Sequence, residues 1–85
     1  MITRMWEARL ADDADVDGLA AALPGFQVYL SYDGPPRLVV ISHWVDEPAI
    51  WAYAGPSWRT DPAPEATAVG DRLAGAPQVW HFTRL

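Results

Sequence analysis

The segment Arg37–Trp58, RLVVISHWVDEPAIWAYAGPSW, decides the fold of this chain. It begins with a strand pattern that is apolar on both faces, one carrying Leu38, Val40 and Trp44 and the other Val39, Ile41 and Val45. A strand that is apolar on both faces has to be covered on both. A chain of 85 residues can supply helices for one face. The sequence therefore predicts a sheet whose second face packs on another copy of itself.

The composition also points to self-assembly. The length suits one small domain over residues 1–85, and a chain of this size buries only roughly 60–65% of the surface that it exposes when unfolded. There is no cysteine, so neither a disulfide nor a thiolate–metal site is available. Oligomerisation is the usual remaining route to stability, and we expect a homodimer.

The charge balance argues against several classes of partner. The net charge is −5, with acids gathered at Asp12, Asp13, Asp15 and Asp17. Nucleic-acid and anionic-membrane binding both call for a basic surface. The first residues enter a strand pattern without a signal peptide, and no apolar run approaches the roughly 20 residues of a membrane span. We expect a cytoplasmic protein with no nucleic-acid or membrane partner.

The order of the elements predicts an α+β fold. The expected strands are 2–10, 26–32, 37–45 and 78–84. The expected helices begin at Asp12 or Asp13 and run to Leu23, and cover 47–54, with a weaker helical piece over 65–73. The resulting β-α-β-β-α-β order is that of the ferredoxin-like split unit, in which helices cover one face of an antiparallel sheet.

Several segments together resemble the antibiotic biosynthesis monooxygenase (ABM) domain. They are Met1–Trp6, Ile41–Trp44 with Asp46–Ile50, Tyr53–Gly55 and Val79–Phe82. The resemblance spans nearly the whole chain, but most of the matching positions are core positions. It implies a dimeric α+β barrel in which two sheets face each other, with a pocket in each subunit between sheet and helices. Members include cofactor-free monooxygenases that oxidise aromatic polyketides and enzymes that degrade haem.

The haem-degrading branch of that family does not match residue by residue. Its first strand carries an asparagine where this chain has Ala8, and its second helix carries a tryptophan where this chain has Tyr53. Its axial histidine follows that helix, where this chain has residues 59–63 without a histidine. Without that imidazole a haem iron lacks its usual ligand. We expect no haem and no other cofactor.

The two histidines, His43 and His81, are the candidates for proton transfer. His43 is in phase with Val39 and Ile41, so we expect it on the face that meets the partner, in a structural role. His81 lies in the last strand between two aromatic residues, and we take it as the candidate base. Two isolated histidines without cysteine argue against a metal site.

The candidate ligand-binding residues are Arg4, Trp6, Tyr53 and Trp58. Arg4 interrupts the apolar face of the first strand, where a charge needs an internal acid or an anionic ligand. The simpler alternative is an arginine that reaches solvent from the edge of the sheet. The aromatic residues either line a pocket for an aromatic molecule or belong to the core. We place Trp44 in the core, and Trp51 at the surface or an interface.

These observations lead to two hypotheses for the function. The first is an ABM-like, cofactor-independent monooxygenase that acts on a small aromatic or polyketide-like molecule, with His81 as base and Arg4 as anion partner. Its substrate would form a stabilised carbanion and reduce oxygen itself. The alternative is a non-catalytic homodimer of the same fold that binds a small ligand or has an accessory role.

Overall fold

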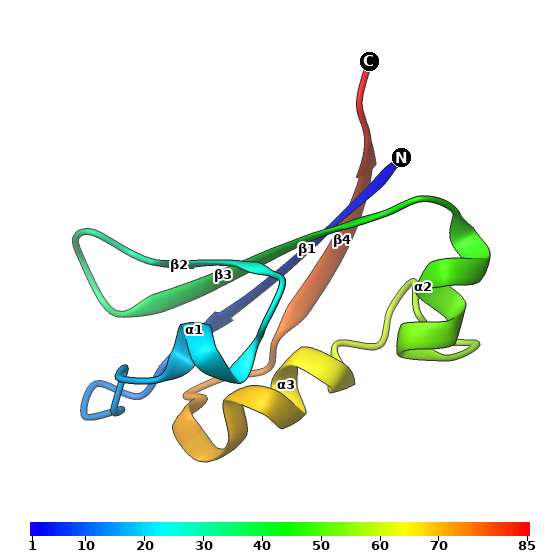
Figure 1. Cartoon of the computed structure of the whole chain (residues 1–85). Coiled ribbons are helices and arrows are strands. Elements are labelled where there is room, and N and C mark those ends of the chain that lie inside the picture. The colour runs from blue at the N-terminus through cyan, green and yellow to red at the C-terminus, as the bar shows by residue number, and fades with distance from the viewer.

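The chain forms a four-stranded antiparallel sheet with its helices on one side (Figure 1). The computed structural model describes residues 1–85. The elements in order are β1 (Ile2–Arg9), α1 (Leu19–Ala22), β2 (Gln27–Leu30), β3 (Arg37–Trp44), α2 (Glu47–Ala54), α3 (Ala63–Val69), the 3-10 turn η1 (Gly70–Arg72) and β4 (Gln78–Thr83). The strand order β2-β3-β1-β4 is compatible with the ferredoxin-like arrangement.

The register divides the sheet into a covered and an uncovered face. Trp6 pairs with Val40 and Ala8 pairs with Leu38, and these four side chains point into the core beneath the helices. The rest of the core cluster is Leu10, Leu19, Leu23 and Val69. The sequence prediction that Leu38 and Val40 face the helices is therefore confirmed.

The opposite side of the sheet, here called the open face, has no helix over it (Figure 1). Its central row consists of Ile41, Met5 and Trp80, which are paired across three strands. Tyr29, Val45, Trp80 and Phe82 are all exposed large hydrophobic residues. Its polar members include Thr3 and His43, whose Oγ1 and Nδ1 atoms lie 3.1 Å apart.

The first helix is much shorter than the sequence predicts. It covers only Leu19–Ala22, and the expected start at Asp12 or Asp13 is wrong. The Asp15 carboxylate accepts a hydrogen bond from the Asp17 amide (2.9 Å), a local contact that competes with helix formation. Gly18 then adopts φ 81°, which a right-handed helix excludes. The acidic run therefore forms an exposed loop ahead of the helix.

The second helix has the predicted bounds because its end signals are local. Asp46 caps it by accepting from the Ala49 amide at 3.0 Å, Pro48 lies in its first turn, and Gly55 ends it at φ 84°. The weaker helical piece is also present, shifted to Ala63–Val69, with Gly70 ending the α-helix. No helix of the structure has both the length and the hydrophobicity to cross a membrane.

The two ends of the chain lie at the same end of the sheet (Figure 1). Ile2 at the start of β1 pairs with Thr83 at the end of β4. β1 is thus a central strand between β3 and β4, while β4 forms one edge of the sheet.

Candidate functional site

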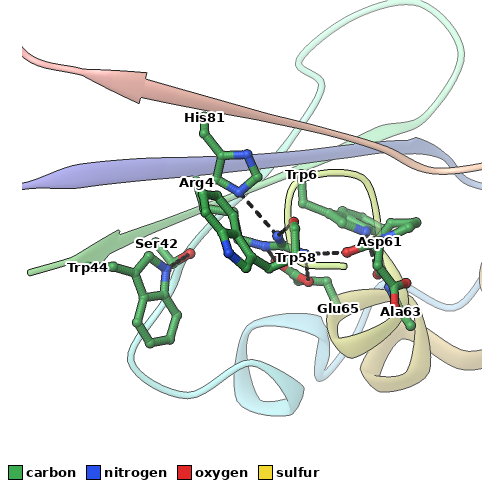
Figure 2. A network of polar contacts seen from close by, with 10 residues as sticks. Arg4, Trp6, Ser42, Trp44, Trp58, Asp61, Ala63, Glu65 and His81 are labelled. Atoms are coloured by element: carbon green, nitrogen blue, oxygen red, sulfur yellow. Dashed lines mark hydrogen bonds and ion pairs between the residues drawn. The ribbon is translucent and has the colours of Figure 1, made fainter. Parts of the chain in front are cut away.

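The most heavily connected polar group of the molecule is the guanidinium of Arg4, which β1 carries on its covered face. Nε and Nη2 donate to the two carboxylate oxygens of Glu65 at 2.7 and 3.1 Å. Nη1 donates to the carbonyl of Trp58 at 2.8 Å, and Nη2 also donates to the carbonyl of Asp61 at 2.7 Å. With the imidazole of His81 3.2 Å from Nη1, all five donors of the guanidinium are engaged (Figure 2).

This burial corrects one sequence interpretation and decides between two others. The side chains of Arg4 and Glu65 are both 0% exposed, so an arginine that reaches solvent is wrong. A buried arginine needs either an acid of the protein or an anionic ligand as its partner. Here the partner is an acid of the same chain, Glu65. The ion pair is bidentate, the geometry in which arginine binds carboxylate most strongly. It ties the α2–α3 loop and the start of α3 to the middle of the sheet.

Glu65 is the site residue that sequence reasoning missed. It lies in the first turn of α3, a segment otherwise composed of small and apolar residues. Its signal was indirect: a buried arginine on one strand requires an acid somewhere in the fold. No local pattern could identify that acid, because 61 positions separate the two partners.

His81 lies on the covered face of β4, opposite Arg4 in the register. Because a guanidinium has only donors, Nε2 of His81 must be the acceptor, and its proton must be on Nδ1. Burial lowers the pKa of His81, and the positive charge of Arg4 lowers it further. The imidazole is therefore neutral at neutral pH. Its ring lies edge-on to Trp58, with centroids 4.8 Å apart.

The predicted aromatic residues separate into three environments. Trp6 is fully buried in the core, with its indole Nε1 donating to the Pro62 carbonyl at 3.1 Å. Trp58 is 6% exposed and lies between His81 and the side chain of Arg59. Tyr53 is in a separate aromatic cluster with Trp44 and Phe26. The structure thus places Arg4 and His81 with Trp58, and puts Tyr53 in the separate cluster with Trp44 and Phe26.

The aromatic cluster around Tyr53 borders an apolar cavity. Tyr53 stacks on Trp44 at 4.7 Å and meets Phe26 edge-on at 5.6 Å. Trp44, which we expected in the core, is only partly buried, and its indole donates to the Ser42 hydroxyl at 2.9 Å (Figure 2). The cavity has a volume of about 260 Å³ and is lined by Ala22, Leu23, Pro24, Phe26, Tyr53, Pro64 and Ala68.

Two electrostatic features define the chemistry beside this cavity. Burial raises the pKa of Tyr53, and the charge of Glu65 raises it further, so its hydroxyl stays protonated at neutral pH. The Arg4 guanidinium lies 5.9 Å from the centre of the Tyr53 ring, but its donors are all engaged elsewhere. The cavity therefore offers an apolar wall and a neutral phenol, and it has no free cation among its lining residues.

A second hollow adjoins Trp58 where Arg59 covers its ring. It has a volume of about 550 Å³ and is lined by Glu47, Pro48, Trp51, Trp58 and Arg59. Trp51, which we placed at the surface or an interface, is 55% exposed there. Arg59 forms an ion pair with Glu47 across it.

Comparison with known proteins returned no matching family model, no matching curated protein and no matching solved structure. The geometry of the chain is therefore the basis of any functional assignment.

Proposed function

We propose that this chain is an ABM-like homodimer that binds a small uncharged aromatic molecule in the cavity beside Tyr53. Two separate observations support the two parts of this proposal: the apolar open face supports the dimer, and the cavity supports the ligand. The cavity beside Tyr53 is the single observation on which the proposed ligand binding rests.

The open face supports the dimer because its apolar residues are contiguous. Ile41, Met5 and Trp80 form one row across the sheet, and Phe82 and Val45 extend it toward one end. Patches of this kind on a small domain normally mark an interface. A face-to-face contact between two copies is isologous, so each apolar row would meet its own symmetry mate. The barrel that the ABM resemblance implies has this arrangement.

The cavity supports an apolar ligand because of what lines it. Its volume of about 260 Å³ is slightly below the usual range of ligand pockets, which begins at about 300 Å³, so it suits only a small molecule. Tyr53 and Phe26 are both lining residues, and aromatic walls favour an aromatic ligand through edge or stacking contacts. The Tyr53 hydroxyl is protonated and has Glu65 as its neighbouring acceptor, so a polar substituent of a ligand would compete with that carboxylate for its proton.

The ligand site is tested by filling the cavity from an exposed position. Ala22 lines the cavity and is exposed, so Ala22→Phe inserts a ring without disturbing the core. The neighbouring Ala21 is exposed and does not line the cavity, and Ala21→Phe is the matched control. Isothermal titration calorimetry with a naphthol should show saturable binding to the wild type and to Ala21→Phe. Ala22→Phe should lose it. Equal binding by both variants, or none by the wild type, would reject the site.

The dimer is tested by placing a charge in the middle of the open face. Ile41→Glu should convert a wild-type dimer into a folded monomer, because a dimer formed through the open face would bury the new carboxylate among apolar residues. Ala52→Glu adds the same charge on an exposed helix position and should leave the dimer intact. Sedimentation equilibrium at micromolar concentration distinguishes these states. A wild-type protein that is a well-folded monomer would exclude the dimer.

A cofactor-independent monooxygenase is the second candidate, and the state of His81 favours it. The imidazole is neutral at neutral pH, as a general base has to be. A substrate with an acidic ring methylene would lose a proton to the base, and its carbanion would reduce O₂. One oxygen atom would become the product carbonyl and the other would leave as water. Against this candidate, Nε2 of His81 already accepts from Arg4.

Oxygen uptake with an anthrone as substrate tests this second candidate. If His81 is the base, His81→Ala should lower turnover by at least about tenfold while the dimer persists. His43→Ala should leave turnover in place and weaken the dimer, because His43 lies on the open face. Full activity in His81→Ala, or no activity in an intact His43→Ala dimer, would contradict these roles. No uptake by the wild type would leave the ligand-binding proposal standing alone.

A further inference from the structure

The hollow beside Trp58 contains a cation that belongs to the protein itself. The guanidinium carbon of Arg59 lies 4.3 Å from the centre of the Trp58 ring, over its face. The same guanidinium pairs with the carboxylate of Glu47 at the start of α2. An indole face and a carboxylate that hold one cation between them are the two elements of an organic-cation site.

The internal cation is held loosely. The side chains of Arg59 and Glu47 are 68% and 57% exposed, and exposed ion pairs contribute little to stability. A long exposed side chain also gains rotamer freedom when it is released. The indole that Arg59 covers behaves differently, because Trp58 is fixed by its edge contact with His81 and by its carbonyl, which accepts from Arg4. The receiving indole is thus held by contacts on its far side, whereas its present occupant is a largely exposed side chain.

The remaining walls of the hollow suit the same type of ligand. Trp51 contributes a second, largely exposed indole, and Pro48 contributes an apolar edge. The volume of about 550 Å³ exceeds what one guanidinium occupies. The net charge of −5 attracts cations to the whole surface.

We propose that this hollow binds a guanidinium-bearing ligand, which displaces the side chain of Arg59 from between Trp58 and Glu47. The planar guanidinium is favoured over a spherical ammonium because it can lie flat on the Trp58 indole while donating to the carboxylate in its own plane. Arg59 acts as an intramolecular competitor that lowers the apparent affinity. This inference is independent of the cavity beside Tyr53.

The test follows the indole N–H signals of Trp51 and Trp58 by nuclear magnetic resonance during titration with argininamide. Citrullinamide, which replaces the guanidinium by a neutral urea of similar shape, is the ligand control. Sodium chloride at matched ionic strength controls for general screening. The wild type should show weak, saturable shifts of both signals with argininamide and none with citrullinamide.

Variants separate competition from nonspecific attraction. Arg59→Ala should bind argininamide at least about threefold more tightly, because the competing side chain is gone. Arg59→Gln keeps much of the aliphatic stem over Trp58 and should also bind more tightly, which provides a second opening variant if Arg59→Ala folds poorly. Arg84→Ala removes the same charge from an exposed position near the C-terminus and should match the wild type.

Glu47→Gln should have the opposite effect on affinity for argininamide. It keeps the shape of the side chain and removes its charge, so affinity should fall several-fold in the wild-type background and in Arg59→Gln. Three results would overturn the proposal: no saturable shift in either Arg59 variant, equal binding of citrullinamide, or unchanged affinity in Glu47→Gln. Equal gains in Arg59→Ala and Arg84→Ala would also overturn it, since they would trace the effect to net charge.

Discussion

At the scale of single residues, the buried pair of Arg4 and Glu65 dominates the covered side of the sheet. Both side chains are removed from water, and every guanidinium donor has an acceptor. Pairing of this kind offsets the desolvation of the two charges only while both partners are present. The contacts to the carbonyls of Trp58 and Asp61 add a second function, because they fix the path of the loop that enters α3.

We predict strong non-additivity between substitutions at these two positions. Glu65→Leu alone should destabilise the fold by about 3–5 kcal/mol, because it leaves the Arg4 charge buried without its partner. The double variant Arg4→Met, Glu65→Leu should recover a large part of that loss. Urea unfolding of the two single variants and the double variant measures the coupling. Additive losses would show that the pair is not an energetic unit.

The neutral state of His81 predicts an acid-sensitive fold. The folded chain resists protonation of His81, whose pKa lies below its ordinary value of 6.5, whereas the unfolded chain accepts the proton near that value. The unfolded state therefore binds more protons as the pH falls through 6.5, and stability declines until the pH reaches the lower pKa of the folded state.

Urea midpoints at about pH 7.5 and about pH 5.5 measure this decline. His81→Gln has no titrating group but keeps an acceptor for Arg4, so it should lose much of the decline. His43→Gln, on the exposed open face, is the matched histidine control and should retain it. An equal decline in the wild type and His81→Gln would assign the effect to other groups.

At the scale of elements, α2 shows how local signals fix an element and thereby a site. Its cap at Asp46, its early Pro48 and its terminal Gly55 all lie within or next to the helix. The helix has eight residues, which is too short to be stable in isolation. Its ends set the positions of Glu47 in one hollow and Tyr53 in the other cavity.

We predict that the cap of α2 contributes measurably to stability. Asp46→Ala removes the acceptor for the Ala49 amide and should destabilise the fold by about 1 kcal/mol. Asp46→Asn keeps an acceptor at the cap and should stay close to the wild type. Thermal unfolding followed by circular dichroism compares the two. Equal losses in both would point to the charge of Asp46 instead of its hydrogen bond.

The contrast between α2 and α1 shows what the sequence could predict. The strands and α2 follow from alternation and from caps that lie a few positions away, and the structure confirms them. The start of α1 was wrong because the aspartates before it form a loop contact, and Gly18 takes a conformation that no periodicity reveals. The pairing of Arg4 with Glu65 depends on the folded topology, so the strand pattern left an internal acid, an anionic ligand and solvent open as partners of Arg4 and did not identify Glu65.

At the scale of the whole molecule, the two sides of the sheet have different roles. The covered side contains the core, the buried ion pair and the cavity beside Tyr53. The open face carries exposed aromatic and aliphatic residues, which include Trp80 and Phe82. Only 13 of the 85 residues are buried in the single chain, so assembly would add substantially to its apolar burial.

The pairing of Ile2 with Thr83 brings the two ends of the chain close enough to be joined, so the same elements could be connected in a different order. Because β1 and β4 are antiparallel neighbours, a short glycine linker from Leu85 to Met1 would turn them into a hairpin. New ends opened between Gly75 and Ala76, ahead of β4, would leave every strand and helix whole. Such a circular permutant should fold, and its free energy of unfolding, measured by urea titration, should lie within about 1 kcal/mol of that of the parent. A permutant that stays unfolded would show that β4 needs its present tether to α3 to find the edge of the sheet.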